Sequence, residues 1–159
     1  MIRHARKEDL PDILKIYNDA IINTTAVYTY DPKELEERLQ WFETKSIAEE
    51  PIWVYVKDHH VVGYATYGSF RDWPAYLYSI EHSIYVDPDY RGQGIASKLL
   101  EILIQDAKAK NYRTIVAGID ASNVGSIELH KKFNFTHAGT IKNVGYKFER
   151  WLDLAFYQL

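Results

Sequence analysis

The spacing of apolar side chains predicts two amphipathic helices near the start of the chain. Apolar residues recur at helical intervals between residues 8 and 23, and a second helix is expected over residues 32–45. The segment between them, residues 24–31, is polar and aromatic and is expected to form an extended loop. Before the first helix, residues 2–5 fit a short strand.

Strand patterns dominate the middle and the end of the chain. Two apolar runs, residues 52–57 and 61–70, flank a short polar turn and predict a β-hairpin, after which residues 71–77 form a loop. The elements expected after this loop are a strand over 78–86, a helix that begins at Ile95, a strand over 114–119, a helix over 123–132, and strands over 136–143 and 148–156. This order favours an α/β or α+β layer fold around one mixed sheet.

Composition and charge narrow the class of protein. The 159 residues fit a single domain, 1–159, and 47% of them are hydrophobic, which is ordinary for a soluble globular protein. The net charge of −3 and the lack of a polybasic run argue against nucleic acid or a membrane surface as a partner. Because the chain has no cysteine, disulfides, thiol nucleophiles and thiolate metal sites are excluded. Its first residues do not resemble a signal peptide and no apolar run is long enough to span a bilayer, so we expect a cytoplasmic protein.

The turn from Arg91 to Ala96 carries the clearest chemical signal. Gly92 and Gly94 lie between a strand and an amphipathic helix, so the turn directs backbone N–H groups and the positive end of the helix at one point. This arrangement binds phosphate, although an ordinary helix entry has the same glycines. A P-loop is excluded because no Gly-Lys-Ser/Thr follows, and a dinucleotide fingerprint is disfavoured because its third glycine is absent.

The sequence Arg-x-x-Gly-x-Ala at this turn, after a strand that ends in Ile-Tyr-Val-Asp-Pro, resembles the acetyl-CoA pyrophosphate motif of the GNAT acetyltransferase superfamily. The resemblance extends over the whole chain, since residues 129–136 match the family's last helix and the aromatic turn after it. It implies a central mixed, mostly antiparallel twisted sheet of about six to seven strands flanked by about four helices. It also implies an acetyl-CoA site made of Tyr85 and Val86 beside the pantetheine arm, Arg91, Gly92, Gln93, Gly94, Ile95, Ala96 and Ser97 at the pyrophosphate, and Asn123 near the pantetheine.

Three further matches are similar to the phosphinothricin N-acetyltransferase branch of that superfamily. They are residues 80–86, the pair Leu129-His130, and residues 145–148 together with Trp151 and Asp153. Members of this branch acetylate the free amine of small amino-acid analogues, including compounds of the methionine sulfoximine type. The resemblance therefore implies an acetyl-CoA-dependent N-acetyltransferase for a small-molecule amine, with direct transfer, no metal and a homodimeric assembly.

Acetyl transfer to an amine requires a base, because an ammonium group has no lone pair with which to attack a thioester. Glu81 lies in mid-strand, ten residues before Arg91, and strand alternation places it on the face opposite His82. We predict Glu81 as the general base, a role that the resemblance also implies; the alternative is a solvated or ion-paired strand glutamate. His82 is interpreted as structural.

A second candidate for proton transfer is His130, on the helix that follows the next strand. It is equally explained as a helix histidine whose ring bonds to a backbone carbonyl, and the resemblance favours the catalytic role. No group of His, Asp and Glu residues has metal-ligand spacing, and this chemistry needs no metal.

An amino-acid acceptor also carries a carboxylate, so its site needs a cation or several hydrogen-bond donors. Arg71 and Tyr76, in the loop before the central strand, match the substrate-binding pattern of the branch in residue type. Trp73 departs from that pattern, because the branch has a second basic residue there. The indole favours a less charged acceptor, such as a sulfoximine or sulfone, over phosphinothricin. Tyr28 and Tyr30 are predicted to close the pocket, with packing of their loop as the alternative.

Two other functions stay open. A GNAT acetyltransferase of another amine class, such as peptide N-termini, aminoglycosides or polyamines, shares the turn and differs in its acceptor pocket. A non-catalytic acyl-CoA-binding module keeps the turn but has no need of Glu81.

Overall fold

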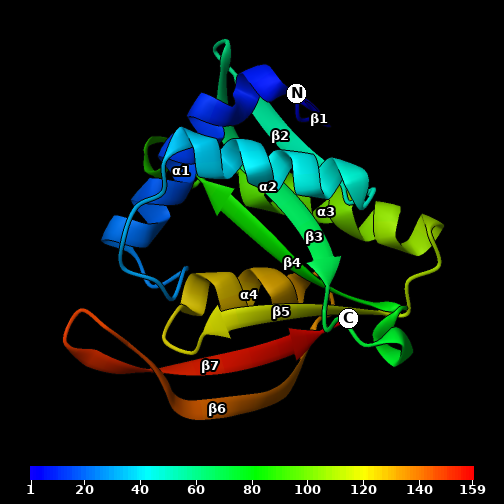
Figure 1. The fold of residues 1–159 in the computed structure, drawn as a ribbon. Helices are drawn as coiled ribbons and strands as arrows, with labels where there is room; N and C mark the ends of the chain where they lie inside the picture. The colour runs from blue at the N-terminus through cyan, green and yellow to red at the C-terminus, as the bar shows by residue number, and fades with distance from the viewer.

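The computed structural model describes residues 1–159, which form a seven-stranded sheet with helices on both of its faces (Figure 1). The strands are β1 (Ile2–His4), β2 (Ile52–Lys57), β3 (His60–Ser69), β4 (Ser79–Val86), β5 (Thr114–Asp120), β6 (Thr136–Lys147) and β7 (Arg150–Gln158). The helices are α1 (Leu10–Asn23), α2 (Leu35–Ile47), α3 (Ile95–Ala109) and α4 (Val124–Lys132). Neighbours in the sheet follow the order β1-β2-β3-β4-β5-β7-β6, and only β4 and β5 run parallel. The predicted α/β fold with a mixed, mostly antiparallel sheet is confirmed.

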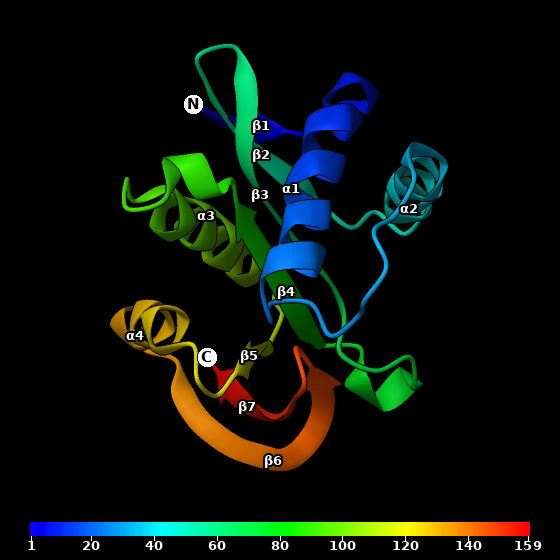
Figure 2. The same cartoon turned by 90° about the vertical axis from the view of Figure 1, so that its left-hand side faces the viewer.

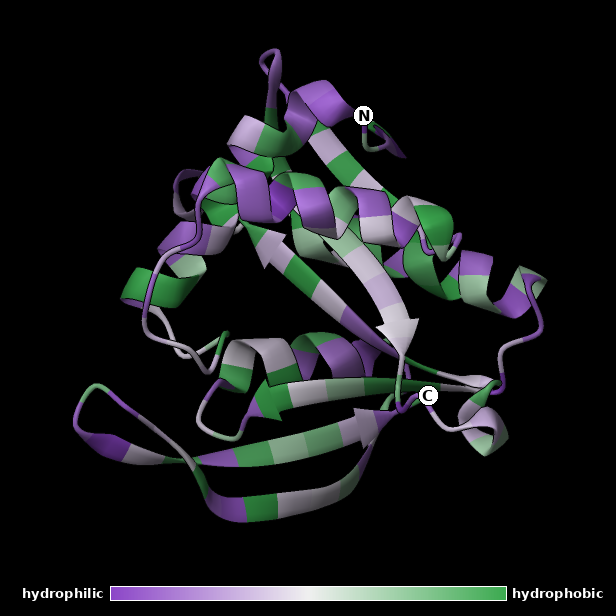
Figure 3. Ribbon diagram, in the orientation of Figure 1, coloured by the Kyte–Doolittle hydropathy of each residue, from purple (hydrophilic) through white to green (hydrophobic).

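Helices α1 and α2 cover one face of the sheet, and α3 and α4 cover the other (Figure 2). Under α1 lies a core of seven buried side chains that includes Leu10 and Tyr64. The core under α3 is larger, with 17 buried side chains that include Leu99 and Leu103. Figure 3 shows hydrophobic positions alternating with polar ones along these helices, as expected for helices that lie between a sheet and solvent. No helix combines the length and the apolar character that crossing a membrane requires.

The predicted helices and strands are confirmed in order, and the largest differences lie at two boundaries. Helix α2 begins at Leu35 rather than at residue 32. The last hairpin turns at Phe148 and Glu149, which have positive φ values of 54° and 59°, so β6 extends to this turn and β7 starts at Arg150. The prediction of a strand from residue 148 was wrong because a turn made by residues other than Gly, Asn or Asp has no sequence signal.

The sheet splits between β4 and β5. These strands pair only from Ser79 to Glu81 on β4 and from Thr114 to Val116 on β5. The rest of β4, residues 82–86, keeps β3 on one side and has no strand on the other. A strand edge of this kind presents unpaired N–H and C=O groups. The split therefore leaves a polar backbone edge at the centre of the molecule.

Candidate active site

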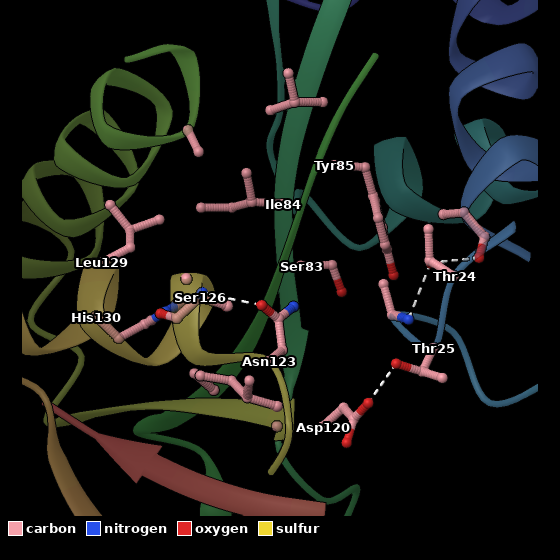
Figure 4. A pocket seen from close by; sticks show the side chains of 18 of the residues that line it. Thr24, Thr25, Ser83, Ile84, Tyr85, Asp120, Asn123, Ser126, Leu129 and His130 are labelled. Carbon is pink, nitrogen blue, oxygen red and sulfur yellow. Dashed lines mark hydrogen bonds between the residues drawn. The ribbon is translucent and has the colours of Figure 1, made fainter. Parts of the chain in front are cut away.

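A cavity of about 840 Å³ lies where β4 and β5 diverge. Its walls come from these two strands, the glycine turn before α3, the start of α4 and the segment that follows α1 (Figure 4). Eight residues that the sequence predicted for the site line this cavity: Glu81, Tyr85, Val86, Arg91, Gly92, Ala96, Asn123 and His130. The split in the sheet thus brings the predicted base and the predicted phosphate turn to one space.

The glycine turn presents free backbone N–H groups. Gly92 and Gly94 have φ values of 77° and 76°, a left-handed conformation that is costly for other residues. Gly94 is the N-cap of α3, and the Lys98 N–H donates the helix's first hydrogen bond, to the Gly94 carbonyl at 3.2 Å. The N–H groups of residues 95–97 consequently have no helical acceptor. They lie at the positive end of the helix, where an anion binds favourably.

Four predicted cofactor residues are not among those that line the cavity: Gln93, Gly94, Ile95 and Ser97. The Ile95 side chain is buried in the core under α3. Gln93 accepts a hydrogen bond from Lys57 Nζ at the end of β2. At the rim, the Arg91 guanidinium is 3.9 Å from the carboxylate of Asp19 on α1. The predicted role of residues 93–97 therefore depends on their main-chain N–H groups.

Glu81 is the last residue of β4 that pairs with β5, and it lines the cavity. Burial raises the pKa of its carboxyl group above the ordinary value, and the positive charge of Arg71 opposes this shift. Neither a hydrogen bond nor an ion pair within the chain contributes to that pKa. A half-buried carboxylate with a raised pKa and free lone pairs is suited to accept a proton.

The second proton-transfer candidate, His130, is half of a buried pair. Its ring stacks on that of His82, with ring centroids 5.1 Å apart and planes within 6° of parallel. His130 Nδ1 donates to the Ser126 carbonyl at 2.7 Å, and the Nε2 atoms of the two rings are 3.0 Å apart. Burial and the neighbouring His130 lower the pKa of His82 to about 3, and burial also lowers the pKa of His130. Both rings are therefore neutral, and both nitrogens of His130 are engaged.

Of the five predicted acceptor residues, only Tyr76 lines a second cavity, of about 500 Å³. Phe70 and Tyr76 line it, with their rings 5.7 Å apart in an edge-to-face arrangement. Arg71 lies over the Phe70 ring, and its Nη1 donates to the Phe70 carbonyl at 2.8 Å. Ser79 also lines this cavity, and strand alternation places it on the same face of β4 as Glu81. Trp73 is 73% exposed and lines neither cavity.

Tyr28 and Tyr30 contact the β6–β7 hairpin and line neither cavity. The Tyr28 hydroxyl donates to the Asp153 carbonyl at 3.1 Å, and the Tyr30 hydroxyl donates to the Tyr146 carbonyl. The Tyr28 ring also lies so close to Gly145 that a Cβ there would be 2.7 Å away. These contacts correspond to loop packing, and a role of the two tyrosines in acceptor binding stays a prediction.

Sequence reasoning missed the wall that Thr24, Thr25 and Ala26 form after α1. Figure 4 shows both threonines across the cavity from the α4 residues. Thr25 donates to the carboxylate of Asp120, which also accepts from the Ser122 N–H at 3.1 Å. Burial by itself favours the neutral acid, but these hydrogen bonds hold the pKa of Asp120 below its ordinary value.

A buried lysine binds the backbone of the segment that follows α1. Lys147 of β6 is 4% exposed, and its Nζ donates to the Thr24 carbonyl at 2.7 Å and to the Val27 carbonyl at 2.8 Å. These partners are more than a hundred residues away along the chain, separated by 123 and 120 positions. The cavity wall after α1 is therefore fixed by contacts that no local pattern reveals.

The sheet splits beside a glycine turn, and the cavity between β4 and β5 holds the free carboxylate of Glu81. This chain is an acetyltransferase, as the family match shows. The chain belongs to the acetyltransferase (GNAT) family, whose model matches residues 10–135. It is 44% identical over 159 residues to the L-methionine sulfoximine/L-methionine sulfone acetyltransferase of Pseudomonas aeruginosa, a match that covers 99% of this chain and 92% of that protein.

Two solved structures show the same architecture. The N-acetyltransferase from Staphylococcus aureus Mu50 has a TM-score of 0.99 and 68% identity, with coverage of 100% of this chain and 96% of that one. The phosphinothricin acetyltransferase from Sinorhizobium meliloti, crystallised in complex with AcCoA, has a TM-score of 0.97 and 35% identity, with coverage of 100% and 86%. The predicted family is confirmed, together with its methionine sulfoximine and phosphinothricin branch.

Proposed function

We propose that the protein uses acetyl-CoA to acetylate the free amine of a small amino-acid analogue, of the methionine sulfoximine, methionine sulfone or phosphinothricin type, by direct transfer. The observation that carries this proposal is the position of Glu81, in one cavity with the glycine turn of α3. The names of two relatives support the acceptor class, and the S. meliloti relative binds AcCoA.

The cavity fits the chemical groups of the donor. Free N–H groups at residues 95–97 suit a pyrophosphate, and the unpaired edge of β4 at residues 82–86 suits the amides of a pantetheine arm. Asn123 Oδ1 accepts from the Ser126 N–H at 3.1 Å, which leaves the Asn123 amide N–H₂ available to donate to a carbonyl. We assign these groups to the donor, with its thioester toward Glu81.

Transfer begins with removal of a proton, because a free α-amine has a pKa near about 8 and is mostly ammonium at neutral pH. Glu81 accepts this proton, directly or through a water molecule. The neutral nitrogen attacks the thioester carbonyl carbon, the C–N bond forms, and the C–S bond breaks. The nitrogen loses a second proton as the amide forms, which balances the proton that the leaving thiolate takes up. His130 can relay a proton to the thiolate only if its Nε2, which accepts from His82, first separates from that ring and takes up the second proton of the nitrogen.

The second cavity supports a small acceptor of low charge. Its lining includes the rings of Phe70 and Tyr76, which accommodate a side chain, and Arg71 beside it offers one positive charge to a carboxylate. Trp73 adds no second charge. We therefore propose that methionine sulfoximine and methionine sulfone are better acceptors than phosphinothricin, whose phosphinate carries an additional negative charge.

A screen with free-thiol readout tests this function. The protein and acetyl-CoA are mixed with methionine sulfoximine, methionine sulfone, phosphinothricin, ordinary amino acids, a polyamine, an aminoglycoside or a short peptide. We expect the fastest thiol release with the first two compounds. Release with only the peptide, polyamine or aminoglycoside assigns another amine class. Calorimetric binding of acetyl-CoA without turnover on any amine identifies a non-catalytic binding module.

We also propose that the protein forms a homodimer. The end of the β6–β7 hairpin exposes three aromatic side chains, Tyr146, Phe148 and Trp151, with exposed fractions of 48%, 53% and 64%. Exposed aromatic residues gathered in one place are typical of protein interfaces. Sedimentation of the wild type and of Trp151→Lys tests the proposal: a dimer that the substitution weakens supports it, and a monomeric wild type contradicts it.

A further inference from the structure

We infer that Gly118 of β5 is a positioning residue for the catalytic carboxylate: its missing side chain leaves the space that the Glu81 carboxylate occupies. The inference rests on the proposed role of Glu81 as the base. Gly118 lines the same cavity as Glu81, and its strand neighbours Ala117 and Ile119 are buried whereas Gly118 is exposed to the cavity.

A Cβ at Gly118 would meet three side chains, and the Glu81 carboxylate is the nearest. A Cβ at this position would lie 3.2 Å from Glu81 Oε2, 3.5 Å from Leu154 Cδ1 and 3.7 Å from Phe156 Cε1. The contact with Oε2 is tighter than nine in ten real Cβ contacts, whereas the other two are ordinary van der Waals distances. The backbone fixes the place of an added methyl group, Leu154 and Phe156 tolerate it, and the Glu81 carboxylate has to give way by a few tenths of an ångström.

The backbone does not explain why this residue is glycine. The turn glycines, Gly92 and Gly94, have positive φ values, whereas Gly118 lies inside a regular strand. Glycine weakens a strand interior, and it often marks a place where another group approaches the backbone closely. Here the approaching group is the carboxylate of Glu81.

Space is the main constraint on Glu81, because no hydrogen bond or ion pair holds its carboxylate. On β5 the register partner of Glu81 is Val116, and Gly118 lies two residues further on. On β3 the register partner of Glu81 is itself a glycine, Gly68. A Cβ at Gly68 would meet the flexible ends of Glu50 and Lys45, at 3.1 and 3.3 Å, and not the Glu81 carboxylate. Gly118→Ala therefore places a methyl group against the Glu81 carboxylate, whereas Gly68→Ala does not.

Steady-state kinetics of Gly118→Ala and Gly68→Ala with methionine sulfoximine test the inference. Gly118→Ala should lower kcat about tenfold or more, because small displacements of a reacting group have large effects, while the KM for acetyl-CoA stays unchanged. Gly68→Ala should keep kcat within about twofold, because its Cβ meets the ends of Glu50 and Lys45 and not the Glu81 carboxylate. If the wild type acetylates methionine sulfoximine and Gly118→Ala has the same kcat and KM, the inference is overturned and the proposed function stays intact.

A double-mutant cycle tests the contact itself. Glu81→Asp withdraws the carboxylate by one methylene group, so Gly118→Ala should cost much less kcat in this background than in the wild type. Equal costs in the two backgrounds contradict the inference. If Gly118→Ala alone does not bind acetyl-CoA in calorimetry, the double variant is compared with Glu81→Asp. Equal kcat values then support the contact, and a further large loss overturns it. A wild type that acetylates no amine defeats the proposed function instead.

Discussion

The Nε2 atoms of His82 and His130 lie 3.0 Å apart, in a buried pair that joins the unpaired part of β4 to α4. Hydrogen-bond chemistry fixes the tautomers. His130 Nδ1 carries a proton because it faces the Ser126 carbonyl, so in the neutral ring His130 Nε2 accepts and His82 Nε2 donates. His82 Nδ1 is left unprotonated, buried and without a partner. A proton added at that nitrogen finds no acceptor, in agreement with the lowered pKa of His82.

Because the histidine pair is buried and neutral, we expect the folded protein to lose stability in acid. The unfolded chain binds a proton at residue 82 below a pKa of about 6.5, while folded His82 stays neutral down to a pKa of about 3. The free energy of unfolding therefore falls as the pH falls below about 6.5, by up to about 1.4 kcal/mol per pH unit from this residue. Denaturant titrations at several pH values measure the slope. His82→Gln, which keeps a donor for His130, should reduce it; equal slopes in the two proteins contradict a neutral pair.

Lys147→Met should loosen the cavity wall after α1. The methionine keeps the length of the side chain but leaves the carbonyls of Thr24 and Val27 without their donor, at a cost of about 1–3 kcal/mol in the free energy of unfolding. We expect a several-fold higher KM for acetyl-CoA, because this segment lines the cavity that we assign to the donor. Lys142→Met is the matched control on the same strand, because the Lys142 side chain is 74% exposed and its ion pair with Asp153, at 3.4 Å, is weak. Similar losses in both variants argue against a specific clamp at Lys147.

Gly94→Ala should weaken acetyl-CoA binding. Position 94 has a φ of 76°, and an alanine there costs about 1 kcal/mol or shifts the turn that presents the free N–H groups. We expect the Kd for acetyl-CoA to rise about fivefold or more in calorimetry, a change of about 1 kcal/mol. Asn111→Ala controls for backbone strain, because Asn111 has a φ of 64° beyond the far end of α3. It should lower the melting temperature while leaving the Kd unchanged; an unchanged Kd for Gly94→Ala removes the turn from the donor site.

The features of the fold and site that could be predicted are those that a short stretch of sequence encodes by itself. The helical period of residues 8–23 and the two glycines of the turn are read from neighbouring residues alone. Strand alternation separates Glu81 from His82, and the structure places Glu81 beside Gly118 and His82 against the rings of His130 and Phe135. Local patterns therefore identified the predicted base and the turn separately, and the structure places both at one cavity.

The parts that were not predictable depend on how distant segments meet. Thr25 and Asp120 are 95 residues apart in sequence, and their hydrogen bond exists because the loop after α1 lies across the end of β5. Alternation assigned His82 to the structural face but carried no information that α4 packs there and places His130 opposite it. The only signals were that His82 shares a strand face with Ile80 and Ile84, and that His130 follows Leu129 in the next predicted helix.

The most direct test of the account is the pH dependence of thiol release by the wild type and by Glu81→Gln, with acetyl-CoA and methionine sulfoximine. Burial raises the pKa of Glu81 above its ordinary value, so the wild-type rate should fall as the pH drops through this raised pKa, because protonated Glu81 cannot accept a proton. Glu81→Gln should bind acetyl-CoA normally but lose about a hundredfold or more in rate. A variant with the wild-type rate and the same pH profile would contradict the assignment of Glu81 as the base.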